Sequence, residues 1–258
     1  MTRAFVRDSG RIFPLPLLPL VIAAAVLLPR AGAGQEREGF SNLEVLPSDI
    51  SRDQLMSVMR GFTRALGVRC STCHVGEEGQ PLSTYDFPSD DKAVKLRARE
   101  MLRMVQAIND TYLAGLPQRR SPGVEVTCVT CHRGVSRPEA IEAIIGRVVV
   151  EEDLDFAIER YRALRARYYG SAAYDFTQRP LLVVAGRLAE DGNADSAMRF
   201  LALNLEYHPQ SAQTMFSMAR LHEELGQVEE AVELYRKGLE IMPENRQARQ
   251  RLEALIGG

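Results

Sequence analysis

The four cysteines of this chain fall into two identical five-residue units. The units are Cys70-Ser71-Thr72-Cys73-His74 and Cys128-Val129-Thr130-Cys131-His132. Two thiols one helical turn apart can reach the two vinyl groups of one porphyrin, and the imidazole that follows can bind its iron. Because C-x-x-C-H is the attachment sequence of c-type haem, the sequence predicts two covalently attached c-type haems, with His74 and His132 as proximal iron ligands.

Three other uses of these cysteines fit less well. A structural zinc site has more closely spaced C-x-x-C pairs and does not require a histidine after each pair. A thioredoxin-like dithiol needs one C-x-x-C on a βαβ pattern, whereas these two lie in helical surroundings. Two local disulfides would leave both histidines unexplained.

The distal iron ligands can be narrowed by elimination. The chain has four histidines, and the two outside the C-x-x-C-H units, His208 and His222, lie far downstream. The methionines between residues 34 and 137 form two i, i+3 pairs, Met56 with Met59 and Met101 with Met104. A Met thioether is a common distal ligand in c-type cytochromes, so we expect one ligand from each pair. One alternative is that these methionines only fill the core. The other is that an iron has no distal ligand and is five-coordinate.

Helices are predicted around each unit. Ser48 or Ser51 can N-cap a helix over residues 52–66, which Gly67 would end. A loop rich in Gly, Pro, Ser and acidic residues covers 76–89, and Ser89, Asp90 and Asp91 then open a second helix to about residue 113. The predicted module is therefore helix, haem loop, helix, haem loop, with the porphyrins replacing much of a conventional core.

Longer stretches around both units, within residues 40–137, carry a family resemblance. Around the first unit, the stretch runs from Met59-Arg60 through Leu66-Gly67-Val68-Arg69 into Cys70. Around the second unit, the stretches are Arg99-Glu100-Met101-Leu102-Arg103-Met104, Ile108-Asn109, and Val126-Thr127 through Arg133-Gly134. This part of the chain resembles the haem domain of the photosynthetic reaction-centre cytochrome c subunit family.

The resemblance implies specific ligands and a specific role. In that family a helix before each attachment site supplies the axial methionine, which implies Met59 for the first haem and Met101 for the second, with Met56 and Met104 as alternatives. Members that serve reaction centres carry four haems in two such halves, and this chain has one half. It therefore resembles a two-haem relative of the subunit that re-reduces the photo-oxidised donor.

The first 33 residues have the composition of a targeting segment. A basic stretch with Arg3, Arg7 and Arg11 precedes an uncharged apolar run, and Ala31-Gly32-Ala33 provides a cleavage site. The segment predicts a signal peptide, with a retained N-terminal anchor as the alternative. Both place the remainder of the chain outside the cytoplasm, in the periplasm or at the outer face of the inner membrane.

The C-terminal half repeats with a period of 34 residues. Six positions recur at that offset, from Ala185, Gly192, Ala197, Phe200, Leu205 and Pro209 to Ala219, Gly226, Ala231, Leu234, Leu239 and Pro243. This period, with one helix-turn-helix per unit, is typical of tetratricopeptide repeats, which bind proteins or peptides in a groove. A helix over about 151–168 would belong to an earlier unit, and one over about 246–255 would cap the array.

The composition excludes several classes of protein. The chain has 258 residues, 45% of them hydrophobic, and its 32 basic and 34 acidic residues give a net charge of −2. This balance argues against a nucleic-acid binder that works through bulk positive charge. The predicted fold is all-α: a signal peptide or anchor at 1–33, a dihaem cytochrome c domain at 40–137, a linker at 138–150 with room for a short helix, and helical repeats at 151–258.

The predicted function is one-electron transfer without a separate catalytic residue. The partners would be redox proteins, such as a membrane-bound reaction centre or a respiratory complex, and a protein or peptide at the repeat groove. One alternative is a haem peroxidase or oxidase with a vacant axial site. The other is a scaffold or redox sensor in which the repeats bind and the haems report redox state.

Overall fold

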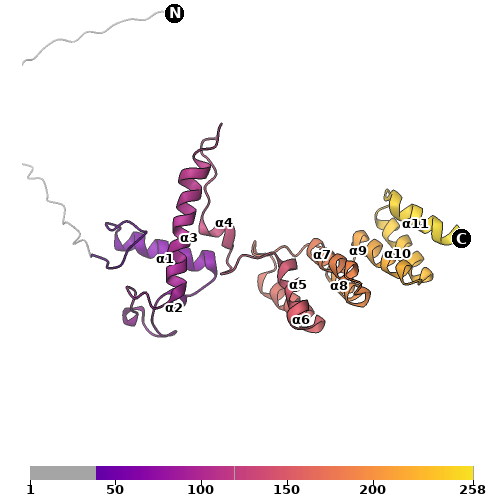
Figure 1. Ribbon diagram of the computed structural model, residues 1–258, viewed down its shortest axis with the longest axis horizontal. Coiled ribbons are helices and arrows are strands. Elements are labelled where there is room, and N and C mark those ends of the chain that lie inside the picture. The colour runs from indigo at the N-terminus through magenta and orange to yellow at the C-terminus, as the bar shows by residue number, and fades with distance from the viewer. Residues whose placement is uncertain (1–38, 119, 258) are drawn as a thin grey trace, which may run out of the picture. The chain divides into compact units, whose positions relative to one another are not determined.

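The computed structural model describes residues 39–118 and 120–257, and these residues are helical with no β-strand (Figure 1). A single isolated bridge joins Val75 to Asp86. The all-α prediction is therefore confirmed for this part of the chain. The predicted signal peptide or anchor lies outside the described residues. Among the described helices, none is long and apolar enough to cross a membrane.

Local sequence signals set the ends of α1 (Arg52–Leu66). Ser51 forms a capping box with Gln54: its hydroxyl accepts from the Gln54 backbone N–H at 3.3 Å, and its own N–H donates to the Gln54 side chain at 3.1 Å. Of the two predicted caps, Ser51 is therefore the one used. Gly67 ends the helix in the left-handed conformation, with φ of 63°, as predicted.

The second long helix begins later than predicted. It comprises α3 (Ala93–Ala107), which passes into a π-helical turn, η2 (Ile108–Leu113). Ser89, Asp90 and Asp91 do not cap it, because the carboxylate of Asp90 is bound to Arg99 and the hydroxyl of Ser89 accepts from the Asp91 N–H. These residues form a turn ahead of the helix instead.

The attachment units form short helices of their own. Cys70–Cys73 is α2 and Cys128–His132 is α4, and a 3-10 turn, η1 (Leu82–Thr84), lies in the loop between α2 and α3. α1 packs against α4, and α2 packs against α3. Among the described residues between 39 and 135, the buried side chains are Ala65, Arg99 and Val135, so the polypeptide core of this module is small.

The segment predicted as a linker is a packed helix. α5 (Ile141–Glu151) buries Ile141, Ile144 and Ile145 in one cluster with α6 (Leu154–Tyr168), so it is part of the core. Its apolar side chains recur three and four residues apart, which places them on one helix face. α5 thereby supplies the missing first half of the early helical pair.

The helices from α5 onward form successive pairs (Figure 1). α5 pairs with α6, α7 (Arg179–Glu190) with α8 (Ala194–Tyr207), α9 (Ala212–Glu224) with α10 (Val228–Ile241), and α11 (Arg246–Gly257) packs on α10. The equivalent turn glycines Gly192 and Gly226 have φ of 78° and 75°. The paired alanines of the period-34 pattern are buried, which explains why only a small residue fits there.

Candidate haem-attachment sites

The first attachment unit places its two thiols on one helical turn. Cys70 and Cys73 begin and end α2, both are half-buried, and His74 follows directly. All four cysteines of the chain are free thiols. Burial raises the pKa of Cys73 and of Cys128, which keeps these thiols protonated.

A backbone carbonyl orients the imidazole of His74. Its Nδ1 lies 3.3 Å from the carbonyl oxygen of Phe87, and the two rings meet edge to face at 4.9 Å between centroids. A carbonyl can only accept, so Nδ1 carries the hydrogen and Nε2 keeps a free lone pair. Burial lowers the pKa of His74, which favours the neutral ring that binds metals.

The second unit repeats this arrangement. Cys128, Cys131 and His132 lie in α4, and His132 Nδ1 is 2.9 Å from the carbonyl oxygen of Val135. The Nε2 lone pair of His132 is therefore free as well. A hydrogen bond from the second ring nitrogen to a carbonyl is the usual support of a metal-bound histidine.

A lysine organises the loop that faces His74. Lys95 Nζ donates to the carbonyl oxygens of Phe87, Pro88 and Ser89 at 2.9, 2.9 and 2.7 Å. It also lies 3.1 Å from Asp90 Oδ1. These contacts hold the Phe87 carbonyl in place beside Nδ1 of the imidazole, so Lys95 supports the first site without touching it.

Arg99 joins three segments of the first site. It is 7% exposed, and its Nη1 lies 2.9 Å from both Asp90 and Glu44, while Nη2 donates to the Asn42 carbonyl at 3.2 Å. The guanidinium, through its hydrogen bond, holds the pKa of Asp90 well below its usual range. The N-terminal segment, the loop before α3 and α3 itself are thereby held together.

Asn109 performs a similar role at the second site. Its amide donates to the Val126 carbonyl at 2.7 Å and its side-chain oxygen accepts from the Val126 N–H at 2.8 Å. This bidentate pair fixes the extended segment that leads into α4. An asparagine inside a strongly helical pattern was the available signal, because Asn disfavours helix interiors.

The predicted axial methionines lie on the two long helices. Met56 and Met59 are half-buried on α1, whereas Met101 and Met104 are 49% and 47% exposed on α3. The two histidines outside the module bind elsewhere: His208 Nε2 is 3.1 Å from the Phe176 carbonyl, and His222 Nδ1 is 2.6 Å from Gln227.

The donor set and its surroundings fit haem. Each unit offers two thiols and one imidazole with a free Nε2, and the module exposes large apolar side chains that a porphyrin could cover. They include Phe87, Leu96, Met101, Met104, Tyr112 and Val129. Within the described residues, no three His, Cys, Asp or Glu side chains are placed to hold a single metal ion, so the two C-x-x-C pairs do not converge on one zinc site.

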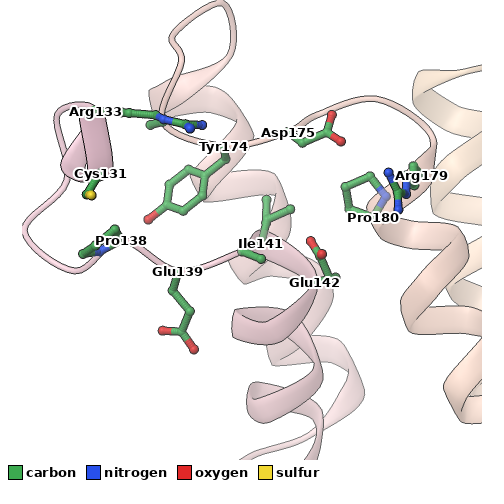
Figure 2. Close-up of a pocket in the computed structure, with 12 residues that line it drawn as sticks. Cys131, Arg133, Pro138, Glu139, Ile141, Glu142, Tyr174, Asp175, Arg179 and Pro180 are labelled. Carbon is green, nitrogen blue, oxygen red and sulfur yellow. The ribbon is translucent and has the colours of Figure 1, made fainter. Parts of the chain in front are cut away.

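The second unit borders a cavity of about 450 Å³ (Figure 2). Cys131, the one exposed cysteine, lines it from α4, and Tyr174 lines it from the segment before α7. Pro138 and Glu139, from the segment before α5, complete this part of the wall. The segments before α5 and before α7 therefore contribute residues directly beside the second attachment site.

Comparison with known families decides the identity of the module. A family model described as photosynthetic reaction centre cytochrome C subunit matches residues 21–189, well over half of the chain. The chain belongs to this family. Membership implies covalently bound c-type haem. A tetratricopeptide-repeat model matches residues 188–256, which confirms the repeat assignment for the C-terminal part.

Individual relatives match over shorter lengths. The photosynthetic reaction center cytochrome c subunit of Roseobacter denitrificans is 31% identical over 133 residues, which is 51% of this chain and 34% of that protein. Cytochrome c-554 of Chloroflexus aurantiacus is 35% identical over 92 residues, 35% of this chain and 20% of that protein. The chain thus spans about a third or less of the length of these relatives.

Solved structures match the repeat region. The first tetratricopeptide domain of Spaghetti (RPAP3), bound to an HSP90 peptide, aligns with 45% of this chain and 88% of its own, at 16% identity and a TM-score of 0.33. The Yersinia enterocolitica type III secretion translocator chaperone SycD aligns with 45% of this chain and 80% of its own, at 14% identity and a TM-score of 0.32.

Proposed function

We propose that this chain is an exported dihaem c-type cytochrome that carries single electrons to or from a membrane-bound partner. Cys70, Cys73 and His74 would hold the first haem, and Cys128, Cys131 and His132 the second. The observation that supports this most is that both histidines bond a carbonyl through Nδ1, at 3.3 and 2.9 Å, and leave Nε2 free. When bound, each haem supplies a one-electron iron couple.

The distal ligands we propose are Met59 and Met101. Met59 would complete the site of His74 and Met101 that of His132. The protein's contribution is then to orient the ligands and to exclude water, while thioether ligation raises the potential relative to histidine. Met56 and Met104 lie one helical turn away on the same helices and remain the competing ligands.

The repeats would dock the partner. Tetratricopeptide arrays present a concave surface formed by stacked helix pairs, and here α5–α11 form three such pairs with a terminal helix. The proposed partner is a redox protein such as a reaction centre or a respiratory complex, which places the chain in the periplasm at the outer face of the inner membrane. Membranes that contain the partner should oxidise the ferrous holoprotein with saturable kinetics.

Haem content tests the central proposal. The full chain, produced with a c-type maturation system, should carry two covalent haems by pyridine haemochrome and by intact mass. Changing Cys70 and Cys73 together to Ala should leave one haem, and the same change at Cys128 and Cys131 should also leave one. A single haem in the wild-type chain would refute the dihaem proposal.

Ligand variants and carbon monoxide separate the carrier from an enzyme. Six-coordinate His/Met haems should leave the ferrous spectrum nearly unchanged under carbon monoxide, whereas an open iron would bind it. Met59→Ala and Met101→Ala should each open one haem to carbon monoxide, and Met56→Ala and Met104→Ala are the matched controls. Carbon monoxide binding by the wild-type chain would instead favour a peroxidase- or oxidase-type enzyme.

A further inference from the structure

Helix α6 carries four closely spaced arginines that electron transfer does not use. They are Arg160, Arg162, Arg165 and Arg167. Arg162 pairs with Glu159 at 2.9 Å and with Glu206 at 2.8 Å. The guanidinium of Arg165 lies over the rings of Tyr169 and Tyr207, at 4.0 and 4.4 Å. These two arginines therefore stabilise the helical region.

The other two arginines face a cavity. Arg160 and Arg167 are exposed and lie seven residues apart, so they share one face of α6. Across the described residues, neither of them forms an ion pair with a carboxylate. Both line a cavity of about 530 Å³, and Arg167 also lies 5.0 Å from the ring centre of Tyr168.

Two further arginines line this cavity. They are Arg137 and Arg147, and each lies 3.2 Å from the same oxygen of Glu139. Among the described residues that line the cavity, Glu139 is the only acidic one, so four arginines and one glutamate give a net charge of +3. This is a local excess of positive charge in a chain whose net charge is −2.

The rest of the lining strengthens the attraction between these charges and an anion. Leu66, Val135, Ile144 and Leu164, with the rings of Tyr168 and Tyr174, form apolar parts of the wall. An ion bound beside apolar groups is less screened by water. Planar guanidinium groups match the geometry of carboxylate and phosphate oxygens, and the volume lies in the range of small-ligand sites. We propose that this cavity binds a small polyanion that carries carboxylate or phosphate groups.

The cavity adjoins the second haem-attachment site. Gly134 and Val135 form part of its wall, and the Val135 carbonyl is the one that holds His132 Nδ1 at 2.9 Å. An anion bound here stabilises the oxidised state of a nearby haem, because that state carries one more positive charge. By reciprocity, oxidation tightens anion binding. This coupling rests on the proposed function, whereas anion binding does not.

Calorimetry on the full-length holoprotein tests binding. Inorganic phosphate and citrate serve as probes in separate titrations, at an ionic strength held constant with chloride, and the tighter probe identifies phosphate or carboxylate chemistry. R160Q/R167Q should weaken binding of the tighter probe by about tenfold or more, since each lost guanidinium removes charge-assisted hydrogen bonds. R162Q, on the same helix but already paired with Glu159 and Glu206, should change it less than twofold.

Spectroelectrochemistry on the same samples tests the coupling. A tenfold tighter binding to the oxidised state would lower the potential of the second haem by 59 mV in wild type and R162Q, and the shift should disappear in R160Q/R167Q. The inference is wrong if neither probe binds more tightly than chloride, or if the double variant binds as wild type does. A haem count on each sample shows separately whether the dihaem proposal holds.

Discussion

Gly67 offers the most direct test of how the two attachment sites are joined. It ends α1 with φ of 63°, and a Cβ built on it would lie 2.0 Å from the carbonyl oxygen of Gly134. Gly134 follows the second attachment unit by two residues, and its N–H donates to the Ala65 carbonyl at 2.8 Å. The end of α1 therefore rests directly on the loop after His132.

Gly67→Ala should separate these segments. An ordinary carbon–oxygen contact is about 3.3 Å, so the loop must move by roughly 1.3 Å. This displacement breaks the hydrogen bond from Gly134 to Ala65, at about 1 kcal/mol, and loosens the packing around it. The left-handed conformation adds about 1 kcal/mol for a residue with a Cβ. The total expected loss is about 2–4 kcal/mol in the free energy of unfolding.

Gly79→Ala is the matched control. Gly79 also has a positive φ, of 89°, but no atom lies within 4 Å of its added Cβ. This variant therefore carries the conformational strain without the collision, and should lose about 1 kcal/mol. The difference between the two variants isolates the contact between α1 and the second site.

Urea unfolding of the holoprotein measures both variants. Circular dichroism in the haem absorption band reports the cytochrome module, and far-ultraviolet dichroism reports all helices. Gly67→Ala should lower the midpoint of the haem-band transition. The part of the far-ultraviolet transition that comes from the C-terminal helices should keep its midpoint. Equal haem-band midpoints for Gly67→Ala and Gly79→Ala would refute the close approach of Gly67 to Gly134.

Three further substitutions test the network at the first site and the repeat core. Asp90→Asn should lower the thermal midpoint at pH 7. Because Arg99 stabilises only the ionised carboxylate and so lowers the pKa of Asp90, the difference in midpoint from wild type should shrink as pH falls below about 4. A difference that stays constant with pH would contradict this. Tyr235→Phe removes a 3.1 Å hydrogen bond to Glu223 and should cost about 1 kcal/mol. Burial raises the pKa of Tyr235 to about 12, so the stability difference between wild type and Tyr235→Phe in urea unfolding should disappear as pH rises from about 10 to about 12. A difference that does not change over this pH range would contradict the prediction. Phe200→Ala, at a side chain with no exposure, should cost about 3–5 kcal/mol in the far-ultraviolet transition, and a loss under about 1 kcal/mol would disprove the packing.

Local patterns determined much of this protein in advance. The bounds of α1, its cap at Ser51 and its end at Gly67 follow from residues within one turn of each helix end. The repeat pairs follow from a period of 34 residues that places alanines where helices approach closely. The haem-attachment units are likewise contiguous, and the assignment of individual iron ligands within them remains a prediction.

Contacts to backbone atoms escaped prediction for a physical reason. The partners of His74 and His132 are carbonyl oxygens, which every residue carries, so no side-chain type marks them. α3 begins at Ala93, later than predicted, because Asp90 binds Arg99 rather than the helix end.

Tertiary packing also decided what similar residues do. α5 became part of the core because α6 and α7 cover its isoleucines, although the sequence around it reads as a linker. Four arginines on α6 look alike in the sequence, yet packing directs two of them to carboxylates and aromatic rings and two to a basic cavity. Periodicity specifies helices and their buried faces, whereas the neighbours of each face depend on how the helices meet.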